Sequence, residues 1–133
     1  MDNLSNLEIV QQVYRDFATG NMQGVMAAFD KDVIWIRPGE PAIPFSGTFR
    51  GTEGLMKMFK IISQTIKIKT FAPHNFFGNG DTVVVIGQDS AEVISTGKTY
   101  TSEWVQIFKL RGKKIIYAQI YLDTLEIARA FHS

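Results

Sequence analysis

The sequence contains no cysteine, so disulfide bonds, thiolate chemistry and cysteine-ligated zinc are all excluded. It has only two histidines, His74 and His132, which stand far apart in the chain and do not suggest a histidine-based metal site. Nucleotide and flavin motifs are also missing. We therefore expect a protein that works without a metal ion or an organic cofactor.

Excess charge and long hydrophobic runs are also lacking. The formal net charge is +1, from 14 lysines and arginines against 13 acidic residues, which gives no electrostatic reason to expect a nucleic-acid partner. No apolar run reaches the length of about 20 residues that a membrane helix needs. The N-terminal segment MDNLSNLEIV lacks the basic start of a signal peptide, so we expect no membrane partner and a cytoplasmic location.

Apolar and aromatic residues are abundant instead. Hydrophobic residues make up 45% of the 133 positions, and ten of them are phenylalanines. A chain of this length can bury a core without covalent staples. We interpret residues 1–133 as a single domain.

Helical spacing predicts three helices in the first half of the chain. The segment Ser5–Glu8 reads as a capping box, and Gly20 is suited to end the helix that follows. Asn21 caps a second, shorter helix whose apolar face includes Phe29. Thr52 caps a third helix, and the proline- and glycine-rich residues 38–51 before it read as an ordered loop across a pocket mouth.

The second half of the chain is mostly strand. The expected strands cover residues 33–36, which precede the loop, and residues 67–77, 82–94, 99–110 and 114–122. A short helix over 124–131 ends the chain. Helices followed by an antiparallel meander are typical of the α+β class. The run Thr82–Ile86 does not alternate between polar and apolar residues, so both faces of this strand should be covered. We expect the helices to cover one face and a second copy of the chain, in a homodimer, to cover the other.

Three stretches carry a family resemblance. They are Gly20-Asn21 with Phe29, Asp32, Val33 and Trp35; the segment from Pro38 to Gly51; and residues 112–124. Together they resemble the SnoaL-like branch of the nuclear transport factor 2-like superfamily, which includes polyketide cyclases and relatives of ketosteroid isomerase. The resemblance implies three N-terminal helices packed on a curved, mostly antiparallel sheet that forms a cone around an internal pocket. It also implies a small, mostly apolar ligand.

Family roles transfer only in part. The resemblance aligns the proton-shuttling aspartate of ketosteroid isomerases with Arg37, which cannot act as a base, and their oxyanion-hole tyrosine with Val13, beside Tyr14. Their protonated aspartate aligns with Gln106, so steroid isomerisation by that mechanism is not expected. Asp89 and Asp123 resemble the two carboxylates of limonene-type epoxide hydrolases, but the arginine of that set aligns with Gly87.

Asp123 and Asp89 are the candidate catalytic residues. Asp123 shares a strand face with Tyr121, and burial there would raise its pKa to a value useful for proton transfer. Asp123 also has the spacing of a helix N-cap with Glu126, and both readings stay open. Asp89 lies in a strand rich in valine and isoleucine, where it faces either a pocket or solvent.

The candidate ligand-binding residues are polar or aromatic side chains on strands and on the first helix. Arg37 would hold a ligand oxygen or form a salt bridge at the rim, and Gln106 is an amide that needs partners if it is buried. The full set is Arg37, Gln106, Trp35, Tyr14, Tyr121 and Trp104. Two functions follow: a cofactor-independent isomerase, cyclase or hydrolase that uses carboxylate acid/base chemistry, or a non-catalytic domain for ligand binding or protein interaction.

Overall fold

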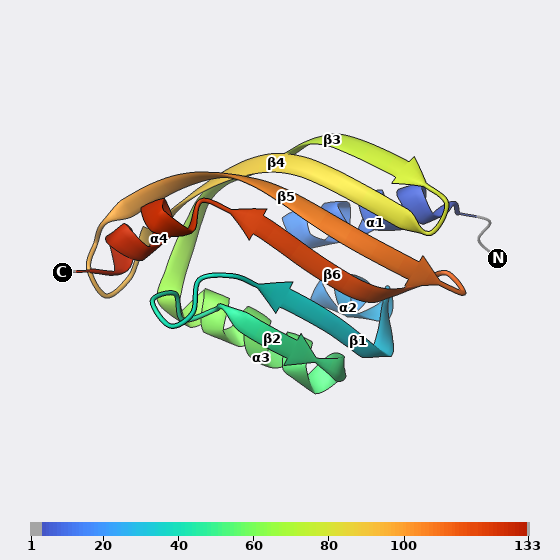
Figure 1. Cartoon of the computed structure of the whole chain (residues 1–133), viewed down its shortest axis with the longest axis horizontal. Coiled ribbons are helices and arrows are strands. Elements are labelled where there is room, and N and C mark those ends of the chain that lie inside the picture. The colour runs from blue at the N-terminus through green and yellow to red at the C-terminus, as the bar shows by residue number, and fades with distance from the viewer. Residues whose placement is uncertain (1–3, 133) are drawn as a thin grey trace.

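The computed structural model of the chain describes residues 4–132, and Figure 1 shows its four helices and six strands. In chain order the elements are α1 (Asn6–Ala18), α2 (Met22–Ala27), β1 (Phe29–Arg37), β2 (Gly47–Arg50), α3 (Gly51–Thr65), β3 (Ile66–Asn79), β4 (Thr82–Val93), β5 (Thr99–Arg111), β6 (Lys114–Leu122) and α4 (Thr124–Phe131). The expected α+β order is confirmed.

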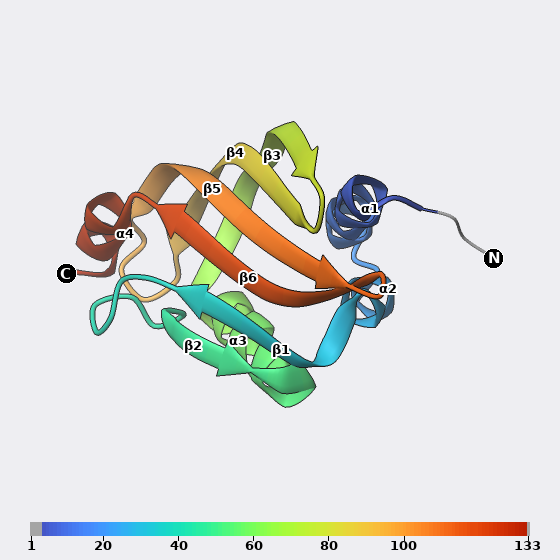
Figure 2. The ribbon, with the colours of Figure 1, turned by 45° about the vertical axis from the view of Figure 1, so that its right-hand side comes forward.

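The strands form one curved sheet in the order β2-β1-β6-β5-β4-β3. Neighbouring strands are antiparallel except β1 and β6, which run parallel and pair Trp35 with Ala118 and Ile36 with Gln119. Helices α1, α2 and α3 pack against the sheet, while α4 lies at the end of the molecule away from α1 and α2 (Figures 1 and 2). The predicted cone of helices and mostly antiparallel strands is confirmed.

Local sequence signals explain the first two helices. The Glu8 backbone N–H donates to Ser5 Oγ at 3.1 Å, and the Ser5 N–H donates back to Glu8 Oε1 at 3.0 Å, which completes the capping box. The Gly24 N–H donates to Asn21 Oδ1 at 3.1 Å and so caps α2. Both helix starts therefore depend on contacts within four residues.

Three expectations about the segment between α2 and α3 are wrong. Phe29 belongs to β1, where it pairs with Ile115, and not to the face of α2. The expected loop contains strand β2, whose residues pair with the last four of β1. Helix α3 begins at Gly51, and its N-cap position is Arg50, with no side-chain cap from Thr52. Each correction follows from strand pairing over long sequence separations, which a local pattern does not reveal.

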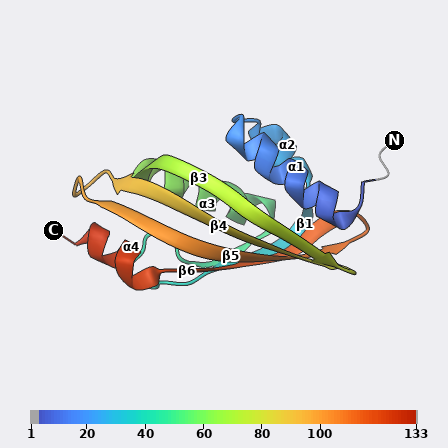
Figure 3. The ribbon, with the colours of Figure 1, turned by 90° about the horizontal axis from the view of Figure 1, so that it is seen from above.

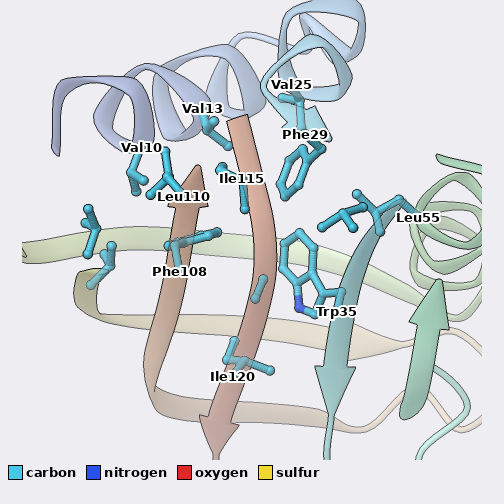
Figure 4. Packing of buried hydrophobic residues seen from close by; sticks show 14 of the residues in the cluster. Val10, Val13, Val25, Phe29, Trp35, Leu55, Phe108, Leu110, Ile115 and Ile120 are labelled. Carbon is cyan, nitrogen blue, oxygen red and sulfur yellow. The ribbon is translucent and has the colours of Figure 1, made fainter. Parts of the chain in front are cut away.

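The buried side chains form two groups. The larger group packs α1, α2 and α3 against the sheet and contains Val10, Val25, Trp35, Leu55 and Phe108 (Figure 4). The smaller group joins the loop before β2 to α4, through residues such as Phe45, Tyr100 and Ile127. These two groups lie toward opposite ends of the cone and leave space between them.

The structure also bears on membrane association. Within residues 4–132, no helix combines the length and the hydrophobicity that a bilayer crossing requires.

Candidate functional site

A cavity opens between the two core groups. The centre of a water-sized sphere can reach about 90 Å³ of it. A single buried water needs roughly 10–15 Å³ by this measure, so the cavity is much larger than a packing defect. Its wall comes from α1, α2, α3, the inner face of the sheet, the loop before β2 and α4. Figure 3 shows these helices around the curved sheet.

Two charged side chains line this mostly apolar cavity, Arg37 and Asp89. Arg37 is the last residue of β1, and Asp89 lies on β4, where it pairs with Ser102 of β5 and Phe71 of β3. Both residues are half-buried. Curvature of the sheet brings these distant strands close enough for each charge to affect the other.

Burial sets the protonation of the Asp89 carboxyl. Loss of water around the carboxylate raises the pKa of Asp89 to about 6, and the nearby positive charge of Arg37 opposes this rise. The Tyr100 hydroxyl lies in the same region, and burial together with Asp89 raises its pKa. Asp89 can therefore give or accept a proton close to neutral pH, as a general acid or base must.

Arg37 is held by an aromatic ring. Its guanidinium carbon lies 5.2 Å from the centre of the Phe45 ring, which is a cation–π contact. Burial lowers the pKa of Arg37 to about 10, which still leaves the side chain charged at neutral pH. Among residues 4–132, no acceptor lies within hydrogen-bond distance of its buried Nε.

Four buried N–H groups of the cavity wall have no acceptor within the described part of the chain. They belong to Trp35 Nε1, Arg37 Nε, Trp104 Nε1 and Gln106 Nε2. Most buried polar side-chain atoms in folded proteins are hydrogen-bonded, and a buried donor without a partner costs about 1–3 kcal/mol. An oxygen acceptor that reached these donors would remove this cost.

Aromatic rings form the wall nearest to α1 and β3. The indole of Trp104 stacks on Tyr14 with ring centres 5.9 Å apart, and on Phe71 with centres 5.4 Å apart. The two ring pairs are inclined by only 8° and 19°. This arrangement presents flat apolar surface next to the polar groups.

Comparison with known proteins identifies the family. The SnoaL-like domain matches residues 10–118, which is most of the chain. This chain belongs to the SnoaL-like family. No match was found among curated proteins.

Solved structures agree with this assignment. An NTF2-like protein from Burkholderia xenovorans is 32% identical, with a TM-score of 0.86 over 96% of this chain and 95% of that one. An NTF2-like protein from Burkholderia thailandensis is 22% identical, with a TM-score of 0.90 over 98% and 99%. TerC, crystallised with polyporic acid, is 24% identical, with a TM-score of 0.80 over 96% and 98%. The last two show the same fold.

Most candidate residues of this SnoaL-like domain meet at the cavity. The structure brings together Asp89, Arg37, Gln106, Trp35, Tyr14 and Trp104. Two other candidates lie outside the cavity. Tyr121 is 50% exposed. Asp123 is exposed and is the N-cap of α4, where it accepts a hydrogen bond from the Glu126 N–H at 3.1 Å. A catalytic role for Asp123 stays a prediction.

Sequence reasoning missed several residues of the SnoaL-like cavity. Tyr100 could have been found, because it has the same strand parity as Trp104 and Gln106. Phe71 and Phe45 could not, because one depends on the pairing of β3 with β4 and the other on the path of an irregular loop. Within residues 4–132, no three histidine or acidic side chains gather as a metal site would require.

Proposed function

We propose that this SnoaL-like domain binds a small, mostly apolar molecule in the cavity and exchanges a proton with it through Asp89. The observation that supports this most is a carboxyl group that lines a mostly apolar cavity opposite Arg37, with its pKa raised by burial to about 6. A base with such a pKa is ionised at neutral pH and still releases the proton readily.

The N–H donors of the cavity wall suit a substrate that is a carbon acid, that is, a molecule with a C–H next to a carbonyl. Asp89 takes the proton from carbon, the C–H electron pair forms a new carbon–carbon double bond, and the π pair of the carbonyl moves onto its oxygen. The enolate oxygen is held by N–H donors such as Gln106 Nε2 and Trp104 Nε1, which are free of protein partners. Return of the proton from Asp89 to another atom of the enolate completes an isomerisation.

Proton exchange into a simple ketone tests this proposal without knowledge of the natural substrate. We would incubate 2-tetralone with the protein in deuterated buffer and follow loss of the α-proton signals by NMR. Removal of a general base typically costs about 10²- to 10⁴-fold in rate, so Asp89→Asn should lose most of the protein-catalysed exchange.

Two further variants are compared with Asp89→Asn in the same exchange experiment. Glu103→Gln changes an exposed acid on β5 and should leave exchange unchanged, whereas Asp123→Asn tests the other acid that the sequence singled out. If wild type and Asp89→Asn exchange equally fast, the catalytic proposal fails. A non-catalytic binding domain then becomes the better account of the cavity.

We further propose that two copies pair through the outer face of the sheet. Across three strands, Val105 lies between Ile86 and Tyr121 in register, and these two residues are 38% and 50% exposed. A patch of this kind can pair with its own copy around a two-fold axis and remove apolar area from water.

A further inference from the structure

We infer that the ligand carries a carboxylate that binds Arg37, with a flat apolar body in the aromatic-lined part of the same cavity. The inference rests on the proposed function, since both place a small ligand in the same cavity. Acid/base chemistry at Asp89 does not specify the charge or the polar group of that ligand.

Arg37 presents its N–H groups in one plane. The guanidinium carbon lies 5.2 Å from the centre of the Phe45 ring. Nε is buried and has no acceptor. A planar fork of N–H groups matches the two oxygens of a carboxylate, and such bidentate pairs are among the strongest hydrogen-bonded contacts in proteins.

Within the described residues, Arg37 has no counter-charge at contact distance. The one ion pair formed within residues 4–132 joins Lys69 Nζ to Glu92 Oε1 at 3.5 Å, so Arg37 is not in a salt bridge. A buried cation is stable when an anion meets it at hydrogen-bond distance. Asp89 is near enough to influence Arg37 but does not form that contact.

Gln106 supplies a further N–H donor near Arg37. Ile36 of β1 pairs with Gln119 of β6, so Arg37 stands level with Ile120, the residue after Gln119. Ile120 in turn pairs with Gln106 of β5. The two long side chains therefore start about 10 Å apart, at twice the usual strand spacing, on the same face of the sheet. Gln106 is 2% exposed and its Nε2 has no partner. A carboxylate has room for about four hydrogen bonds and can satisfy both residues.

The negative charge of Asp89 would oppose a ligand carboxylate. The titratable groups that face Asp89 are Arg37 from β1 and Tyr100 from β5, and Tyr14 from α1 faces Arg37 in turn. Neither tyrosine ionises near neutral pH, because burial raises both pKa values. Protonation of Asp89 removes the repulsion, so a carboxylate ligand should bind more tightly below about pH 6.

A series of probes of one shape tests the inference by calorimetry. The probes are 2-naphthoate, the neutral 2-naphthamide and the cationic 2-naphthylmethylammonium ion. We expect 2-naphthoate to bind about 10- to 100-fold more tightly than the amide, as for a hydrogen bond to a charged group, and the cation to bind most weakly. Equal affinities for the acid and the amide, or tightest binding of the cation, would overturn the inference.

Variants locate the effect. Arg37→Met keeps an apolar stem against Phe45 and should weaken 2-naphthoate binding about 10- to 100-fold while the amide keeps its affinity, which also shows that the cavity is intact. Arg50→Met, at an exposed arginine of β2, is the matched control and should change neither affinity. If Arg37→Met weakens both probes equally, the carboxylate is not at Arg37 and the inference fails.

The pH dependence gives a separate readout. Between about pH 8 and about pH 5 the affinity for 2-naphthoate should rise several-fold in wild type and stay level in Asp89→Asn. If the amide binds as well as the acid, only this inference fails. If no probe binds at all, the inference fails and the proposed function loses its support as well.

Discussion

Gly87 lies directly beneath the indole of Trp104. A Cβ atom at Gly87 would come within 2.4 Å of Trp104 Cζ2 and within 2.8 Å of the carbonyl oxygen of Ala72. Only a residue without a side chain fits there, although glycine usually weakens a strand. The absent side chain thus lets Trp104 lie flat on β4 and form the aromatic wall of the cavity.

A methyl group at position 87 should therefore be costly. Gly87→Ala forces Trp104 or the neighbouring strand to move, and we expect a loss of about 1–3 kcal/mol in the free energy of unfolding, measured by urea denaturation. Gly78→Ala is the matched control, because a Cβ there meets Leu7 Cβ at an ordinary 3.4 Å. Equal losses for the two variants would show that the approach of Trp104 is not the cause.

The raised pKa of Asp89 makes stability depend on pH. Its pKa rises from an ordinary 3.8 to about 6 in the folded protein, so folding favours the protonated form. The stability gained by burying that neutral form is complete below about pH 4 and is lost as the pH rises through about 6. Asp89→Asn should gain on the order of 1–3 kcal/mol relative to wild type between these pH values.

Urea denaturation of both proteins at several pH values provides the measurement. A stability difference that does not change with pH would contradict the raised pKa. Glu92→Gln is the control on the opposite face of β4, where the exposed pair with Lys69 contributes at most about 1 kcal/mol.

The cap at Asp123 predicts a loss of stability without a loss of binding. Asp123→Ala removes the acceptor for the Glu126 N–H and should lower the free energy of unfolding by about 0.5–2 kcal/mol. Asp123→Asn retains the acceptor and should be nearly as stable as wild type. If Asp123→Asn folds normally but abolishes proton exchange into 2-tetralone, Asp123 acts in catalysis after all.

The proposed dimer is tested by a charge on the outer sheet face. Wild type should scatter light with the mass of two 15.0 kDa chains at micromolar concentration, and Ile86→Glu should scatter as one. Ile94→Glu is the control, because Ile94 is 47% exposed but follows the end of β4. A monomeric wild-type mass at this concentration would count against the dimer.

Local signals in the sequence predicted much of the fold. Capping at Ser5 and Asn21, the turns around Gly80 and Gly112, and the bounds of β6 and α4 depend on contacts between near neighbours. Phe29, strand β2 and the start of α3 were mispredicted because long-range pairing decides them. The parallel contact between β1 and β6 joins segments about 80 residues apart and has no local signature.

The sequence by itself determined which side chains share a face: parity along β5 placed Trp104 and Gln106 together, and parity along β6 placed Tyr121 with Asp123. It did not determine which of these faces turns inward. The tertiary structure decided that, because the helices cover only one side of a curved sheet. Asp89 consequently lines the cavity and has a raised pKa, whereas Asp123 emerges on the outer side and caps a helix.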